Sequence, residues 1–288
     1  MMMTRYIMIA GLIGGITISG CNSGKSTDTT TNSDVPPPAT VPHTDTVGVS
    51  QKVSMVISSI PFPTNIFDSL HYVHGQYQNN MTNPTDNAST YSQSNAQAIN
   101  LGIYGADLSY VISFEQFNQV GAYMKATKYL ADKVGVPMAF TEDVIERCQK
   151  NSNNRDSLTR IVYSSYGVID QKLKDDKRKS TEVLVLAGGW LEGLYITTES
   201  FSTISAVTDR QGAYNILMDQ KRYLDLLLNQ LDLISDSPYC TDISTGLHDI
   251  RSVYNNAVGT SMSNGVIQSL AEKAANLRAR IIKGGSVQ

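Results

Sequence analysis

Long segments with apolar residues at three- and four-residue steps dominate this chain of 288 residues, and they are what most restricts its fold. Such spacing places the apolar side chains on one face of an α-helix, whereas strand-like alternation is scarce. The clearest example is the run Leu224, Leu227, Leu228, Leu231 and Ile234. The sequence therefore predicts an all-α fold, either a multi-helix bundle or a stack of antiparallel helical hairpins.

Capping residues, glycines and prolines divide this pattern into a short first helix and eight long ones. Thr64 or Asn65 is expected to begin the short helix, which reaches about Tyr77, and residues 79–87 are expected to form a polar loop. Ser237-Pro238 is expected to end the sixth long helix. The eight long helices are predicted over residues 90–113, 114–134, 141–150, 156–174, 180–198, 209–234, 242–258 and 264–283.

Residues 1–20 have the pattern of a secretory signal peptide, with a positive start, an apolar run and small residues. The apolar run is about 13 residues long, shorter than the ~20 that a membrane-spanning helix needs. The segment Ile18-Ser19-Gly20-Cys21 resembles the lipobox of bacterial lipoproteins, which implies cleavage before Cys21 and acylation of that residue. Several acyl chains would hold the protein at a membrane stably. The alternative is an ordinary secretory signal with a chance cysteine.

The next segment, residues 21–50, consists of the lipidated Cys21 and a stretch rich in Ser, Thr and Pro that is nearly free of large aliphatic side chains. Such a composition cannot form a core, so we expect a disordered tether. Residues 51–288 are long enough for one large core and are expected to form a single helical domain.

Charge and cysteine content limit the classes of function. The formal net charge is −3, and the densest basic cluster, residues 172–179, also contains Asp175 and Asp176, so we expect no nucleic-acid partner. Cys148 and Cys240 could form a disulfide in an extracytoplasmic compartment or remain as buried thiols, and the sequence leaves both possibilities open.

The first long helix contains two glycines in its middle, Gly102 and Gly105, each costing about 1 kcal/mol relative to alanine. Close approach by a neighbouring helix would offset that cost. Asp107 follows among apolar residues, with Tyr104 and Tyr110 three positions away on nearly the same face. If Asp107 faces the core, it needs a partner, because an unpaired buried carboxylate is very costly.

The fifth long helix shows the same features, with glycines around the only tryptophan and one glutamate in an apolar run. Both helices are apolar nearly all round, so we expect them to be central and to pack against each other through their glycines. The candidate pocket residues are then Tyr104, Asp107, Trp190, Glu192 and Tyr195.

Three interpretations of this cluster remain open. The carboxylates could form a structural network, capping a helix or pairing with Arg155 or Arg160. They could instead line a ligand pocket, since buried titratable groups beside aromatic rings are typical of such sites. As a pair, Asp107 and Glu192 could also act as acid and base in glycoside hydrolysis, although the sequence does not give their separation.

A second group of polar residues, Asp68, His71 and His74, occurs at three-residue spacing in the short first helix. Two histidines on one helix face can bind zinc, but no third ligand of known position accompanies them. A surface histidine pair is the simpler interpretation, and we expect neither a metal nor a cofactor.

The segments Ile60-Pro61-Phe62-Pro63, NLGIYGADL (residues 100–108) and AGGWLEG (residues 187–193) resemble a family of uncharacterised, mostly helical bacterial envelope lipoproteins. The resemblance covers most of residues 55–283 and implies a helical fold and an envelope location, but no activity. Phe62 departs from the pattern, because a small residue is expected there. Asn22, and not Asp, follows Cys21, which resembles sorting to the outer membrane.

The sequence therefore predicts a membrane-anchored envelope lipoprotein that binds a partner protein or ligand or serves as a scaffold. The alternative is a small hydrolase or carbohydrate-active enzyme that uses a buried carboxylate pocket. A closed region around Asp107 and Glu192 with complete hydrogen bonding would favour the binding module, and an open cleft would favour the enzyme.

Overall fold

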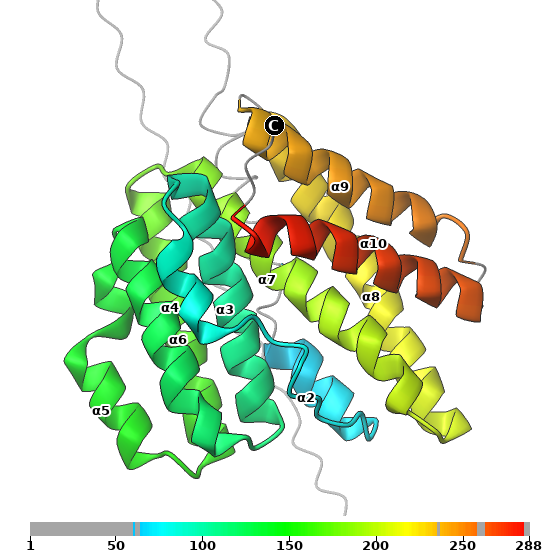
Figure 1. Ribbon diagram of the computed structural model, residues 1–288, viewed down its shortest axis with the longest axis horizontal. Coiled ribbons are helices and arrows are strands. Elements are labelled where there is room, and N and C mark those ends of the chain that lie inside the picture. The colour runs from blue at the N-terminus through cyan, green and yellow to red at the C-terminus, as the bar shows by residue number, and fades with distance from the viewer. Residues whose placement is uncertain (1–59, 61–63, 235–236, 258–262, 285–288) are drawn as a thin grey trace, which may run out of the picture. The chain divides into compact units, whose positions relative to one another are not determined.

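The computed structural model describes residue 60 and residues 64–234, 237–257 and 263–284, and every regular element among them is helical (Figure 1). The all-α fold predicted from the sequence is therefore confirmed. The predicted signal peptide, Cys21, the linker and Pro61–Pro63 lie outside the described residues. None of the described helices is long and apolar enough to cross a membrane.

Nine α-helices and four 3₁₀ turns make up this described part of the chain, and most of their bounds fall within a few residues of the prediction. The α-helices are α2 (Thr64–Tyr72), α3 (Ser94–Ser113), α4 (Phe117–Val134), α5 (Glu142–Lys150), α6 (Arg155–Asp175), α7 (Lys179–Ser200), α8 (Val207–Leu231), α9 (Pro238–Tyr254) and α10 (Asn264–Ile282). The 3₁₀ turns are η1 (Thr85–Thr90), η2 (Pro137–Phe140), η3 (Phe201–Thr203) and η4 (Asp232–Ile234).

The short helix α2 ends at Tyr72, so the predicted extension to Tyr77 is wrong. His74 adopts a left-handed conformation with φ 56°, and the Gly75 amide donates to the Leu70 carbonyl at 3.0 Å. This is the hydrogen-bond pattern with which many helices end. The early end releases the chain into an extended connection before η1, and that connection forms part of the site described below.

The prediction that Ser237-Pro238 ends the sixth long helix is also wrong. Helix α8 ends earlier, at Leu231, and Ser237 caps α9, its hydroxyl accepting the Cys240 amide at 3.2 Å. Proline suits the first position of a helix, where no intrahelical partner exists for its missing N–H. The predicted cap by Thr141 on α5 is present, with its hydroxyl accepting the Val144 amide at 3.4 Å.

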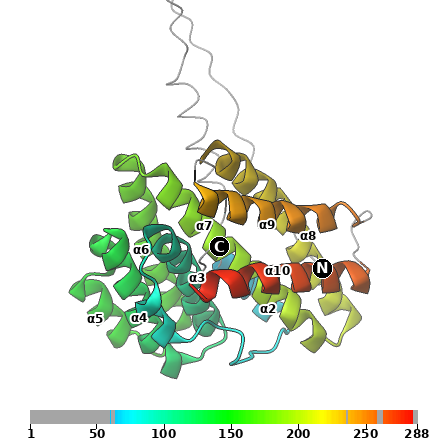
Figure 2. The ribbon, with the colours of Figure 1, turned by 45° about the horizontal axis from the view of Figure 1, so that its top comes forward.

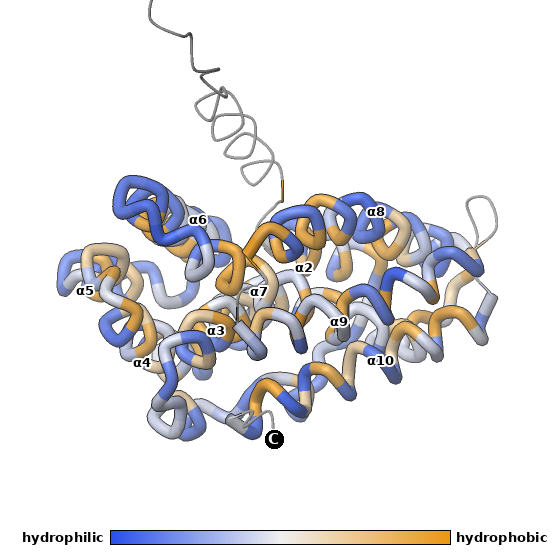
Figure 3. The backbone as a smooth tube through the Cα atoms, turned by 90° about the horizontal axis from the view of Figure 1, so that it is seen from above, coloured by the Kyte–Doolittle hydropathy of each residue, from blue (hydrophilic) through white to orange (hydrophobic). Residues whose placement is uncertain are grey.

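Helices α3 and α7 lie side by side at the centre of the described part (Figures 1 and 2). Helices α4 and α6 pack against α3, whereas α8 and α10 pack against α7. The outer helices α8 and α10 alternate between polar and apolar residues along their length, as expected when only one face is buried (Figure 3). By contrast, most residues of α3 and α7 are buried on all sides of the helix.

Glycines bring the backbones of α3 and α7 into direct contact, as the sequence predicted. A Cβ atom at Gly102 would lie 2.0 Å from the Val185 carbonyl oxygen, and one at Gly188 would lie 1.9 Å from the Ile99 carbonyl oxygen. At Gly105 the hydroxyl of Tyr166, from α6, fills the space that a side chain would occupy. The close approach therefore accounts for the glycines that propensity alone disfavours.

The two described cysteines are free thiols and both are buried. Burial raises the pKa of Cys148 to about 11, although the nearby charge of Arg147 lowers it slightly. Of the two possibilities left open by the sequence, the structure therefore shows buried thiols.

We expect Gly102→Ala and Gly188→Ala to lower the free energy of unfolding by about 3 kcal/mol or more, because a methyl group would meet backbone atoms that cannot move aside. The matched control is Gly121→Ala in α4, where nothing lies within 4 Å of the new Cβ. That change should raise stability by about 0.5–1 kcal/mol. Urea unfolding of the three variants measures both effects, and equal effects at all three sites would contradict the role of the contact.

Candidate functional site

Asp107 of α3 and Glu192 of α7 lie together in the core, and both side chains are fully buried. A third residue, Arg278 of α10, joins them. Its Nε donates to Glu192 Oε2 at 2.6 Å and its Nη2 donates to Glu192 Oε1 at 2.7 Å. This is the two-pronged pairing that makes guanidinium–carboxylate contacts strong and directional.

Arg278 is surrounded by further contacts that hold its side chain in place. Its Nη2 also donates to the Met81 carbonyl at 2.8 Å, and its guanidinium lies 4.4 Å from the centre of the Tyr195 ring. Burial alone would lower the pKa of Arg278, but the Glu192 carboxylate raises it, so the guanidinium stays charged. The charge of Arg278 is thus balanced by Glu192.

Asp107 is the remaining carboxyl group of the cluster. Burial raises its pKa well above the usual 3.8, the neighbouring Glu192 charge raises it further, and Arg278 only partly opposes them. Asp107 Oδ2 accepts the Asn83 amide at 3.0 Å, whereas Oδ1 has no hydrogen-bond donor among the described residues. Both facts favour the protonated form of Asp107, because a proton on Oδ1 removes a buried negative charge beside Glu192 and needs no donor.

The main chain of residues 77–84, here called loop 77–84, is the common partner of these buried polar groups. Its residues Asn83 and Met81 bind Asp107 and Arg278, as described above. Two tyrosines of α3 also bind its main chain. The Tyr104 hydroxyl donates to the Pro84 carbonyl at 2.7 Å, and the Tyr110 hydroxyl accepts the Gln78 amide at 2.9 Å. Buried polar side chains of α3 and α10 therefore set the path of this loop.

One side-chain hydrogen bond adds to these main-chain contacts. The Tyr123 hydroxyl, from α4, donates to Thr82 Oγ1 at 2.6 Å. Burial raises the pKa of Tyr123 to about 12, so this phenol keeps its proton at neutral pH. Loop 77–84 is thus joined to α4 as well as to α3 and α10.

The structure brings together most, but not all, of the candidate pocket residues. Asp107, Glu192 and Tyr195 share the cluster around Arg278, and Tyr104 binds the same loop. Trp190 is buried, but its indole N–H has no hydrogen-bond partner among the described residues. None of the five lines either of the two surface hollows described below.

The partner of the buried carboxylates is Arg278, and not Arg155 or Arg160 as the sequence suggested. Arg155 lies beside Asp156 and His71, and Arg160 donates to Ser157. A signal for Arg278 was present in the sequence. It lies four residues after Ala274 and three before Ile281, within the apolar stripe of its own helix.

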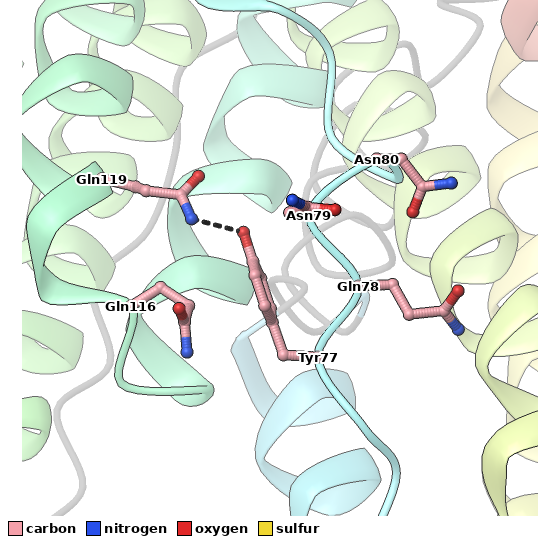
Figure 4. A pocket seen from close by; sticks show the side chains of 6 residues that line it. All are labelled: Tyr77, Gln78, Asn79, Asn80, Gln116 and Gln119. Carbon is pink, nitrogen blue, oxygen red and sulfur yellow. Dashed lines mark hydrogen bonds between the residues drawn. The ribbon is translucent and has the colours of Figure 1, made fainter.

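Two adjoining hollows, of about 480 and 560 Å³, lie between loop 77–84 and the beginning of α4. They share Asn79, Asn80 and Gln119, and we call them together the amide groove. Figure 4 shows the first hollow, in which Gln119 donates to the Tyr77 hydroxyl at 2.8 Å. The complete lining is Tyr77, Gln78, Asn79, Asn80, Thr82, Pro84, Thr85, Asp86, Gln116, Asn118, Gln119, Ala122, Tyr123 and Arg278.

The amide groove was not predicted from the sequence, which indicated only a polar loop at residues 79–87. A signal existed in the density of Asn and Gln in two short segments, residues 78–83 and 116–119. What no pattern could show is that these segments face each other. Their meeting depends on the contacts that hold loop 77–84 against α3.

Asp68, His71 and His74 do not converge on one point. Asp68 accepts the Ser113 hydroxyl at 2.8 Å, His71 lies 3.1 Å from an Arg155 nitrogen, and His74 pairs with Asp209 at 3.0 Å. In the described part of the chain, no group of three or more His, Cys, Asp or Glu side chains is arranged to hold a metal ion.

Comparison with models of known protein families, with curated proteins and with solved structures gives no match. The geometry of the chain itself is therefore the basis for a proposal of function.

We expect Glu192→Gln to lower the free energy of unfolding by about 3–5 kcal/mol, because it leaves the buried Arg278 charge uncompensated. Asp107→Asn should cost far less at neutral pH. An amide at this position can still accept the Asn83 N–H, and like a protonated carboxyl it adds no charge beside Glu192. Chemical denaturation at pH 7 compares the two, and equal losses would contradict a protonated Asp107.

The parent protein and the Asp107→Asn variant should also differ in how their stability depends on pH. The folded protein holds the Asp107 proton more tightly than the unfolded chain does, so this stabilisation is complete below pH ~4 and is lost as pH rises through the raised pKa. The Asp107→Asn variant lacks this loss. Its stability relative to the parent should therefore increase between about pH 5 and pH 9, and a constant difference would show that Asp107 is already ionised.

Proposed function

We propose that this protein is a membrane-anchored envelope lipoprotein whose helical domain binds a ligand in the amide groove. The observation that carries the proposal is the way loop 77–84 is held by buried side chains of α3, α4 and α10. The loop in turn supplies one wall of the groove, where Tyr77 reaches Gln119 of α4 and Gln78, Asn79 and Asn80 complete the loop's part of the lining (Figure 4).

Holding a loop in this way has a thermodynamic consequence for binding. Loops are usually mobile, and a ligand that orders one must offset the lost conformational entropy. Here that entropy is already lost on folding, since hydrogen bonds from the core determine the main-chain path. The exposed side chains Asn79 and Asn80 are thus presented on a prepared backbone, as expected of a binding site supported by a rigid layer beneath it.

The alternative of a hydrolase using Asp107 and Glu192 is less well supported. Both carboxyl groups are fully buried, Glu192 is occupied by Arg278, and loop 77–84 lies directly on Asp107. A general acid and base must come within hydrogen-bonding distance of a substrate. The region around the two carboxyl groups is closed, which favours a binding module, although its hydrogen bonding is incomplete at Asp107 Oδ1.

The anchoring half of the proposal rests on the sequence of residues 1–21 and on the resemblance to envelope lipoproteins. Acyl chains on Cys21 would attach the protein to a membrane, most simply the outer membrane given Asn22. The Ser, Thr and Pro-rich linker would then separate the binding domain from the lipid surface.

When the full chain is expressed in a Gram-negative bacterium with an alkyne-tagged fatty acid, we expect the label on the protein and the protein in the membrane fraction. Cys21→Ser removes the acceptor thiol and should abolish both. The parent chain is the control, because the two proteins differ only at residue 21. Label that persists in Cys21→Ser would contradict acylation at this residue.

Binding at the groove is tested by thermal-shift measurements of the full chain in detergent against neutral sugars, peptidoglycan fragments, amino acids and divalent metals. A compound at about 100 times its dissociation constant should add ~2.7 kcal/mol and raise the melting temperature visibly. We expect the Asn80→Ala/Asn118→Ala variant to lose this rise, because both exposed amides line the groove. Asp107→Asn should keep the rise. A rise lost in Asp107→Asn alone would favour the enzyme.

A further inference from the structure

From the chemistry of its lining, we propose that the amide groove takes a neutral saccharide, a short oligosaccharide whose hydroxyl and carbonyl oxygens are bound by side-chain amides. This inference rests on the proposed binding function and adds the chemical class of the ligand. Two observations support it: the side-chain amides of the groove lining, and the pairing of Arg278, the cation of that lining, with Glu192.

The amide side chains of the groove carry both a donor and an acceptor. Gln78, Asn79 and Asn80 from the loop line the first hollow together with Gln116 and Gln119 from the beginning of α4. In Figure 4 the Gln119 side chain points toward the loop, whereas Gln78 and Asn80 extend on the side of the loop away from Gln119. A sugar hydroxyl is also both a donor and an acceptor, so neighbouring hydroxyls match the N–H and C=O of one amide. A lining of this kind suits a ligand with many hydroxyl groups.

The electrostatic balance of the groove favours a neutral ligand. Arg278 is the only cation in the lining, and its charge is balanced by the buried Glu192 carboxylate. Asp86 adds one exposed negative charge. With the cation balanced and an acid at the rim, a strongly anionic ligand gains little from this surface.

Arg278 nevertheless offers hydrogen-bond donors to the groove. Its side chain is 9% exposed, and its Nε and Nη2 are taken by Glu192 and Met81. The Nη1 group has no partner among the described residues, although Arg278 belongs to the lining. An uncharged acceptor such as an acetamido carbonyl or a hydroxyl oxygen can accept a hydrogen bond from this N–H group without adding charge to the groove.

Tyr77 supplies an aromatic surface in the same place. Its ring stacks on Tyr110 with centroids 5.0 Å apart and an angle of 29°, and its hydroxyl accepts from Gln119. These contacts hold the ring in position while it lines the hollow. An amphipathic ring with one polar end suits the face of a sugar, which combines C–H groups with hydroxyls.

Peptides are a poorer match for this surface. Peptide-binding grooves recognise side chains through apolar pockets, or add a strand to the edge of a sheet. The groove lining is polar apart from Pro84, Ala122 and two tyrosines. No strand is present in the described part of the chain, so no sheet edge is offered there.

The test is isothermal titration of the full chain, in a detergent without a sugar head group, with chitotriose and maltotriose. The comparison probes are trigalacturonate, as a charged saccharide, and trialanine. We expect saturable binding of a neutral trisaccharide, with affinity reduced about tenfold or more in Asn80→Ala/Asn118→Ala. Affinity should stay nearly constant between about 0.05 and 0.5 M salt, because no net charge is neutralised.

Asn153→Ala is the matched control, because Asn153 is an exposed asparagine between α5 and α6, outside the groove lining. It should bind as the parent does. Binding of only trigalacturonate or trialanine, weakened by the groove variant, would overturn the ligand class and leave the binding function standing. No binding of any probe, or binding unaffected by the groove variant, would overturn the saccharide site in the groove. A thermal-shift hit with another compound would then decide the binding function separately.

Discussion

The backbone contact between α3 and α7 is the constraint on which the rest of the structure depends. Gly102 and Gly188 allow the two helices to touch, and this approach places Asp107 against Glu192 in the core. Two ionised carboxylates cannot be accommodated there without compensation. Arg278 balances the charge of Glu192, and the raised pKa of Asp107 favours its neutral form. The cation from α10 and the raised pKa of Asp107 are thus consequences of a close helix contact.

A buried ion pair of this kind contributes little to stability by itself, because desolvation offsets much of the attraction. The hydrogen bonds that surround the ion pair instead hold loop 77–84 in place. Asp107 accepts from the Asn83 amide, Arg278 donates to the Met81 carbonyl, and the tyrosines of α3 bind the main chain on either side. The network therefore determines one conformation of a surface loop, at a cost in stability that the apolar core carries.

Much of the fold was predictable, because helix periodicity and glycines in apolar helices are local signals. The need of Asp107 for a partner also followed from the sequence. The identity of that partner did not, since the sequence suggested Arg155 or Arg160, and the position of Arg278 in the apolar stripe of its helix does not say which carboxylate it meets. The end of α2 was misplaced because no sequence signature marks His74 as a left-handed cap. The end of α8 was misplaced because Ser237-Pro238 can end one helix or begin the next. The groove was beyond prediction, because it depends on tertiary contacts of loop 77–84.

One guanidinium connects the two parts of the site. Arg278 binds Glu192 through Nε and Nη2, donates to the Met81 carbonyl through the same Nη2, and lines the second hollow of the groove. The interior thereby controls the groove in two ways, through the path of the loop and through the charge that the groove presents. If Glu192 did not balance Arg278, the groove would attract anions. With the balance in place, its donors remain while its net attraction for charge is small, which is the property expected of a surface that selects neutral polar ligands.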